Sequence, residues 1–298
     1  KDLQLPSTSV HRSWKGIFVK ELEAHEILIR NGSLDSSVDI DGIEISSFSS
    51  ASEMAEVGEL SQSANHYFNA LNASILNDGV CIKIKRNAVI DKPILLSNVV
   101  DGEEVLGASR ILVIAEPGSQ CTVIEQGIFS EGSNGLISRV AEIFVHANAQ
   151  FEHIMLQDFA PNQSALHTTD ARIKRDGNYT NHVVTFGGEV VRNELNIELA
   201  DEHCECHLNG LYLLEGKSHV DNHTLVDHQQ PNCESNEYYK GVMMDRSTGV
   251  FNGKVYVRED AQKTNAYQQN RNLLLSDHAT INTKPQLEIW ADDVKCSH

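Results

Sequence analysis

A cysteine and a histidine stand two residues apart in Cys296-Ser-His298, the last residues of the sequence. Because side chains alternate across an extended strand, the thiol and the imidazole are expected on the same face. Lys295 and nearby backbone amides would favour the thiolate, and one metal ion or metal cluster could bind both side chains. A cluster usually takes about four ligands, so the pair would supply only half of a site, which another chain or a transient donor would have to complete. The alternative is a chain end in which neither residue has a role.

Cys204 and Cys206 are also separated by one residue. Their thiols would share one face of a strand, whereas His203 and His207 would point to the other face. One strand therefore cannot supply a compact site of two cysteines and a histidine. Free cysteines pack well as small core side chains, so burial is predicted rather than chemistry. The same structural role is predicted for two cysteines within apolar strands, Cys81 and Cys121.

Two other patterns resemble binding motifs. His219, Asp221 and His223 would form a row on one face of a strand, which permits metal ligation, but a polar row on a solvent-exposed face is commoner. Gly216-Lys217-Ser218 resembles the end of a phosphate-binding loop, which requires a glycine five positions before Gly216 and a helix after it. Position 211 is leucine and the following segment has the pattern of a strand. Neither a metal site nor a nucleotide site is predicted here.

The composition narrows the possible partners. The sequence holds 42 acidic and 24 basic residues, and a net charge of −18 repels nucleic acid and anionic membrane surfaces. No run of 18 apolar residues occurs, and the first residues lack the apolar core of a signal peptide. The six cysteines are scattered, which is typical of reduced thiols. We therefore expect a cytoplasmic chain that binds neither nucleic acid nor membranes.

Residues 1–76 are predicted to form a small lead-in of short strands and one helix. Gly16–Val19 and Ile27–Ile29 are apolar runs, and Asn31-Gly32 favours a tight reversal between strands. A helix is predicted from Ser52 to about Leu71, because apolar residues recur there at three- and four-residue spacing after a serine that can cap it. The apolar positions are Met54, Val57, Leu60, Ala64, Tyr67, Phe68 and Leu71.

Residues 77–298 are predicted to be nearly all strand. Short β-branched stretches alternate with Gly, Asn and Asp, and several segments resemble one unit in which a strand meets a polar kink and then a second strand. Gln120, Gln150, Asn178 and His203 mark the start of the second strand at spacings of 30, 28 and 25 residues, about one turn of a β-solenoid. An antiparallel sandwich is the alternative, and the handedness cannot be read from these residues.

The final 35 residues resemble the SufB/SufD family of the SufBCD iron–sulfur cluster assembly complex, and their ending resembles its SufD branch. Weaker similarity runs upstream through 235–241, 91–94 and 76–80. The segments that carry the resemblance are Thr264-Asn-Ala-Tyr-Gln-Gln-Asn-Arg-Asn-Leu-Leu-Leu-Ser-Asp-His278, Thr283-Lys-Pro-Gln-Leu-Glu-Ile289 and Asp292-Asp-Val-Lys-Cys-Ser-His298.

The resemblance implies a right-handed parallel β-helix and a non-catalytic scaffold subunit that pairs with SufB. It further implies that Cys296 and His298 lie at the shared junction and contact a transient iron–sulfur cluster, which this chain alone does not bind stably. Family members continue beyond the position of His298 with a glycine-rich strand and helices that dock the ATPase SufC. Binding to SufC is thus expected through a C-terminal region absent from this sequence.

Two rival functions follow from the same fold class. A carbohydrate-active β-helix enzyme would use surface carboxylates such as Asp292 and Asp293. A homodimeric scaffold unrelated to cluster assembly would pair with a second copy of itself. The sequence distinguishes neither the type of cluster nor the association of a reduced flavin.

Overall fold

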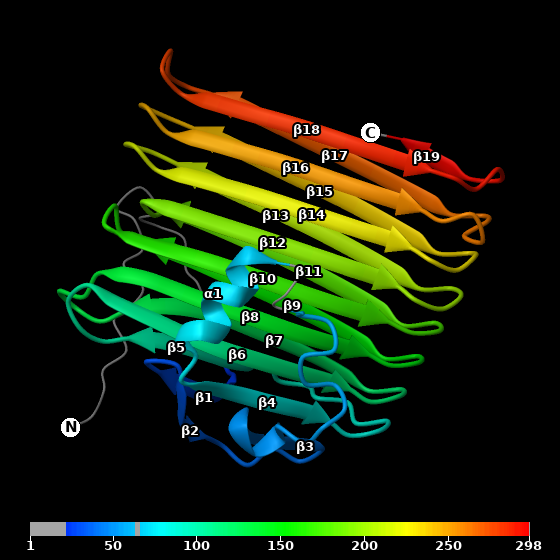
Figure 1. The fold of residues 1–298 in the computed structure, drawn as a ribbon, viewed down its shortest axis with the longest axis horizontal. Coiled ribbons are helices and arrows are strands. Elements are labelled where there is room, and N and C mark those ends of the chain that lie inside the picture. Colours follow the sequence, from blue (N-terminus) through cyan, green and yellow to red (C-terminus); the bar gives the residue numbers. More distant parts are fainter. Residues whose placement is uncertain (1–21, 63–65, 298) are drawn as a thin grey trace.

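The computed structural model describes residues 22–62 and 66–297. The chain is nearly all β, with 61% of its residues in strands and 4% in helices, and it winds into a parallel β-solenoid of about 8 turns. Figure 1 shows the strands stacked in two sheets with the carboxyl-terminal strands at one end. The predicted all-β solenoid with a small helix-and-strand lead-in is confirmed.

Each sheet is built from alternate strands of the chain. Every pairing is parallel except β1 with β2 and β3 with β4. The ten-stranded sheet contains, in spatial order, β19 (Lys295–Ser297), β17 (Asn265–Leu274), β15 (Glu234–Met243), β13 (Glu205–Leu214), β11 (Asn178–Gly187), β9 (Gln150–Phe159), β7 (Gln120–Phe129), β5 (Ile94–Val100), β1 (His25–Arg30) and β2 (Ser33–Ser37). The nine-stranded sheet contains β18 (Thr280–Ile289), β16 (Thr248–Val257), β14 (His219–His228), β12 (Val190–Leu199), β10 (Gln163–Ile173), β8 (Gly135–Val145), β6 (Val105–Ala115), β4 (Asp78–Ile84) and β3 (Ile43–Ser47).

The stacking register corrects one of the four predicted strand markers. Gln120 pairs with Gln150, Gln150 with Asn178, and Asn178 with Glu205 rather than with His203. The last spacing is therefore 205 − 178 = 27 residues instead of 25. His203 lies in the preceding turn with a φ of 59°, a conformation that ends one strand rather than starting the next. Asparagine and aspartate fill similar turn positions at Asn148, Asp176, Asn232 and Asp245.

The predicted reversal at Asn31-Gly32 joins β1 to β2 in an antiparallel hairpin. Both residues have positive φ, 46° and 87°, as a tight hairpin turn requires. β1 also pairs with β5, and β3 pairs with β4, so the lead-in adds strands to both sheets. The apolar run Gly16–Val19 lies outside the described residues. The division of the chain into 1–76 and 77–298 stays a prediction.

The helix predicted from Ser52 to Leu71 is wrong over most of its length. A short 3-10 helix η2 (Ser49–Ala51) and a series of turns precede the single α-helix of the described chain, α1 (Tyr67–Ile75). Gly58 has a φ of 73°, which interrupts a helix. The apolar side chains of Met54, Val57 and Leu60 nevertheless pack on a small cluster outside the nine-stranded sheet.

Tertiary hydrogen bonds explain why the segment after Ser52 is not helical. The carboxylate of Glu142 on β8 accepts backbone N–H groups from Gly58 at 2.9 Å, Leu60 at 2.9 Å and Ser61 at 3.1 Å. These amides bond to the solenoid instead of to carbonyls one turn earlier, so contact with the sheet overrides the local helical pattern. Helix α1 follows and lies across the outer face of the same sheet (Figure 1).

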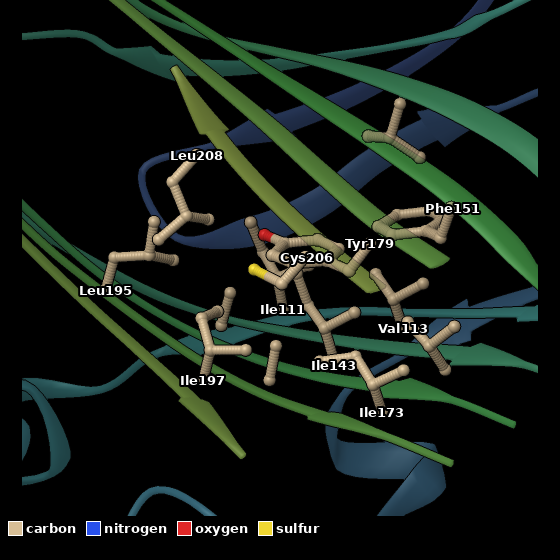
Figure 2. Close-up of a cluster of buried hydrophobic side chains, with 14 of the residues drawn as sticks. Ile111, Val113, Ile143, Phe151, Ile173, Tyr179, Leu195, Ile197, Cys206 and Leu208 are labelled. Atoms are coloured by element: carbon tan, nitrogen blue, oxygen red, sulfur yellow. The ribbon is translucent and has the colours of Figure 1, made fainter. Parts of the chain in front are cut away.

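The core fills the space between the two sheets with stacked columns of inward-facing side chains. Figure 2 shows Ile111, Ile143 and Ile197 of the nine-stranded sheet facing Phe151 and Tyr179 of the ten-stranded sheet. The two aromatic rings stack at 6.2 Å between centroids with an interplanar angle of 6°. In-register stacking thus places like side chains on top of one another along the solenoid. Among residues 22–62 and 66–297, no helix is long and apolar enough to cross a membrane.

Candidate functional site at the last coil

Cys296 lies in β19, which pairs with the start of β17 in the last coil of the described chain. Its partner in the ladder is the fully buried Ala266, and Cys296 itself is half-buried and packs against the main hydrophobic core. The thiol therefore belongs to an inward-facing column at the end of the solenoid. The column contains Cys121, Phe151, Tyr179, Cys206, Ser235, Ala266 and Cys296.

The second predicted ligand, His298, lies outside the described residues. Its placement on the same face as Cys296 therefore stays a prediction. Ser297, between the two, is exposed, as expected if alternate residues of β19 face outward.

The electrostatic setting of Cys296 differs from the expected one. Burial raises the pKa of the Cys296 thiol above its ordinary value, and a hydrogen bond from the backbone amide of Ala266 offsets only part of the rise. Proximity to Lys295 does not produce the thiolate that was expected. Because metal ligation requires the deprotonated form, binding at Cys296 must be coupled to loss of a proton.

The surface around the last described coil carries both polar and apolar side chains. A groove of 560 Å³ on the outer face of the ten-stranded sheet reaches Ser297 and is bordered by Tyr238 and Tyr267, and most of its other lining residues are polar. The exposed large apolar residues of this coil are Tyr267, Leu273, Leu274, Leu275, Ile289 and Trp290.

The burial predicted for Cys81, Cys121, Cys204 and Cys206 is confirmed. Cys204 and Cys206 are fully buried, while His207 points outward and His203 lies in the turn before β13. Burial raises the pKa of two further thiols, to about 11 for Cys81 and to about 12 for Cys121. Thiols in this state are poor nucleophiles and poor metal ligands.

The histidine row on β14 belongs to an ion-pair network. His223 contacts Asp221 at 2.9 Å, and Arg192 of the neighbouring strand β12 contacts both residues. The guanidinium occupies the position that a metal ion would take between these side chains. Gly216-Lys217-Ser218 forms the turn between β13 and β14, so a strand follows it, as predicted. Within the described part of the chain, no three His, Cys, Asp or Glu side chains lie close enough together to hold a metal ion.

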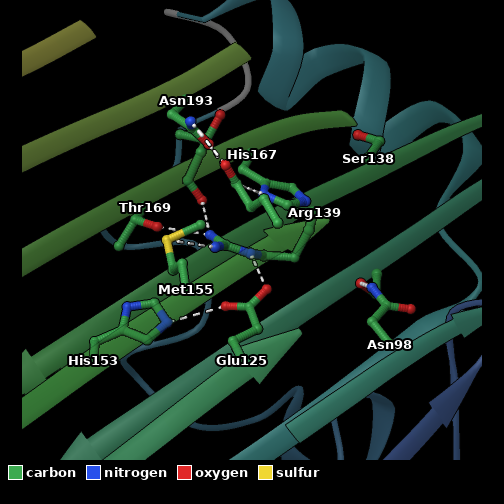
Figure 3. A network of polar contacts seen from close by, with 12 residues as sticks. Asn98, Glu125, Ser138, Arg139, His153, Met155, His167, Thr169 and Asn193 are labelled. Atoms are coloured by element: carbon green, nitrogen blue, oxygen red, sulfur yellow. Dashed lines mark hydrogen bonds and ion pairs between the residues drawn. The ribbon is translucent and has the colours of Figure 1, made fainter. Parts of the chain in front are cut away.

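A buried polar network lies inside the solenoid and was not predicted from the sequence (Figure 3). The fully buried Arg139 donates from Nε to Glu125 at 2.7 Å and from a terminal nitrogen to Thr169 Oγ1 at 2.6 Å. His153 Nε2 lies 3.0 Å from the other oxygen of Glu125. Burial acts to raise the pKa of Glu125, but the charge of Arg139 and the contact with His153 outweigh it and hold that pKa below its ordinary value. The sequence signal that could have revealed this network is a charged residue within each of two apolar strands, Glu125 in β7 and Arg139 in β8.

A second buried carboxyl group lies nearer to Cys296. Glu237 on β15 faces inward and accepts a hydrogen bond from the side-chain amide of Gln268 on β17. Burial raises the pKa of Glu237 to about 7. The protonation state of this side chain therefore changes near neutral pH, two coils before the strand that contains Cys296.

Comparison with known proteins gives a consistent match. The family model described as "SUF system FeS cluster assembly, SufBD core domain" matches residues 98–298. Iron-sulfur cluster assembly protein SufD of Escherichia coli is 34% identical over 236 residues, which cover 78% of this chain and 56% of that protein. An iron-sulfur cluster assembly SufBD family protein of Synechocystis is 33% identical over 244 residues, covering 78% of this chain and 54% of its own length.

A third relative, a SufBD family protein of Mycobacterium tuberculosis, is 28% identical over 230 residues, and the match spans 56% of that protein. The chain thus spans about half the length of these curated relatives.

Proposed function

This chain belongs to the SufBD family of the SUF iron–sulfur cluster assembly system, and we propose that it serves there as a scaffold subunit that pairs with SufB. In this proposal Cys296 and His298 bind a nascent iron–sulfur cluster at the shared interface. The cluster is cargo, held transiently between two chains and not stably by this chain alone. We assign no catalytic turnover to the chain by itself.

The observation that carries the proposal is the position of Cys296. Its thiol is half-buried in the inward-facing column that contains Ala266, and in the sequence it lies two residues from His298. One thiol and one imidazole supply two of the roughly four ligands of a cluster. In this proposal the remaining ligands come from outside the pair.

The raised pKa of Cys296 fits the same scheme. A thiol that stays protonated in the isolated chain is a weak ligand, and it becomes a strong one only when a metal or an approaching partner lowers its pKa. Cluster binding would then depend on assembly of the complex. SufC is the third subunit of the proposed complex.

The exposed apolar residues of the last coil also favour a second possibility, a homodimer formed through the same surface. Mixing the chain with SufB and measuring the mass of the species in solution distinguishes the two. A heterodimer supports the proposal, whereas a homodimer that persists in the presence of SufB contradicts it.

The test of the site uses Cys296→Ala and His298→Ala in the complex assembled with SufB and SufC. We expect both variants to form the complex and to lose most of the iron and acid-labile sulfide that the unmodified complex binds. Ser297→Ala is the matched control, because Ser297 lies between the two residues and is exposed. Normal cluster yields in both ligand variants would remove the proposed role.

A further inference from the structure

Two buried cysteines face each other across consecutive coils at one corner of the solenoid. Glu205 pairs with Glu234 in the ladder of β13 and β15, and the residues just before them are Cys204 and Cys233. The backbone confirms the match, because the N–H of Glu234 donates to the carbonyl of Cys204 at 2.9 Å. The two cysteines are thus neighbours in space although 29 positions apart in sequence (233 − 204 = 29).

The thiols share their surroundings. Both sulfur atoms lie close to the backbone carbonyl oxygen of Asp201, at 3.1 Å from Cys204 Sγ and 3.2 Å from Cys233 Sγ. The two side chains also form a hydrogen bond with each other. Cys206, two residues further on and equally buried, is paired with Ser235 and has no thiol beside it in the ladder.

The corner suits small side chains, and this alone could explain a cysteine there. The equivalent positions in successive coils are Ser119, Ala149, Gly177, Cys204, Cys233 and Thr264. Size does not explain why two thiols occur in adjacent coils and share one acceptor. Adjacent coils lie about 4.8 Å apart, which is within the range of Cα separations, roughly 4.4–6.8 Å, that a disulfide spans.

We propose that Cys204 and Cys233 form a redox-active dithiol that a hydroperoxide oxidises reversibly to a disulfide. The thiolate of one cysteine attacks the peroxide oxygen and becomes a sulfenic acid, releasing one water molecule. The second thiol then attacks that sulfur, the S–O bond breaks and a second water molecule leaves. In total, two thiols lose two protons and two electrons, and hydrogen peroxide is reduced to two molecules of water.

The contacts do not order the two thiols. Both Sγ atoms share the Asp201 carbonyl oxygen, so either thiol can react with the peroxide first and the other then acts as the resolving thiol. Both lie directly beneath the turns that contain Asp201 and Pro231, so a small oxidant needs only a local opening of these turns to reach them.

The experiment exposes the full chain to hydrogen peroxide, blocks the remaining thiols with an alkylating agent and maps the products by mass spectrometry. Digestion after glutamate cuts at Glu205 and separates Cys204 from Cys206. We expect a Cys204–Cys233 cross-link, reversed by a dithiol reductant, that forms roughly tenfold faster than oxidation of Cys206.

Cys204→Ala and Cys233→Ala are the matched variants, and alanine fits because Ala149 occupies the same position two coils before Cys204 and three coils before Cys233. Each should abolish the cross-link, while Cys206→Ala should retain it. The proposal is overturned if all six thiols remain free in the unmodified chain, or if a disulfide forms between other cysteines. None of these outcomes depends on cluster assembly, so this proposal can fail while the scaffold function stands.

Discussion

Arg139 and Glu125 form an ion pair inside the solenoid, with Nε of Arg139 2.7 Å from a carboxylate oxygen of Glu125 and both side chains buried. The two residues come from consecutive strands, β8 and β7, of opposite sheets. The pair therefore connects the two sheets through charge, whereas most of the core connects them through apolar packing and a few neutral hydrogen bonds such as Gln157 to Asn193. Buried pairs of this kind cost desolvation energy, and their main effect appears when one partner is removed.

We predict that Arg139→Met destabilises the chain by about 3–5 kcal/mol, because it leaves the Glu125 carboxylate buried without its cation. The double variant Arg139→Met with Glu125→Gln should recover a large part of that loss, since no unpaired charge remains. Equilibrium unfolding in urea measures both values. Equal destabilisation of the single and double variants would show that the charge on Glu125 is not what makes the single variant costly.

Glu237 predicts a dependence of stability on pH. Burial raises its pKa from the ordinary 4.5 to about 7 in the folded chain. Between these values the folded chain holds a proton that the unfolded chain has lost, so the contribution of Glu237 to stability is full below pH 4.5 and declines as pH rises through 7. Glu237→Gln removes this decline, and relative to the unmodified chain it should gain about 3 kcal/mol between pH 4.5 and pH 8.

The measurement is the free energy of unfolding of both chains across that pH range. Glu234→Gln is the control, because Glu234 lies on the same strand with its side chain partly exposed. A difference between Glu237→Gln and the unmodified chain that does not change with pH would contradict the assignment.

Glu142 should hold the segment before α1 in its ordered conformation. Its carboxylate accepts three backbone amides, from Gly58, Leu60 and Ser61. Glu142→Gln removes the charge and replaces one acceptor oxygen with a donor, so we expect local opening of residues 58–61 to become easier by about 1–3 kcal/mol. Amide hydrogen exchange should then speed up about tenfold or more in these residues and remain unchanged in β16, several coils away. Unchanged exchange in 58–61 would mean that apolar contacts alone hold the segment.

The solenoid could be predicted because its signals are local. Alternation with period two identifies the strands, and asparagine or aspartate at positions such as Asn148 and Asp176 identifies the turns. The exact residue at which a coil starts was harder to predict. His203 and Glu205 are two residues apart, so both fit the alternating pattern equally well, and only the pairing of Glu205 with Asn178 distinguishes them.

Contacts between distant parts of the chain could not be predicted in the same way. The amphipathic pattern after Ser52 is real, but whether its amides bond within a helix or to Glu142 depends on a residue more than 80 positions away. Likewise, period two places Glu125, Arg139 and His153 on inward faces without indicating that they meet. For the candidate site, the sequence identified Cys296 by its spacing from His298, yet the effect of burial on its thiol required the fold.

The in-register stacking has a last consequence for how damage spreads through the molecule. Each coil is held mainly by the coils directly above and below it, so the structure behaves like a one-dimensional row of units. A substitution that weakens one coil should therefore loosen that coil and its immediate neighbours first, while coils several turns away keep their protection.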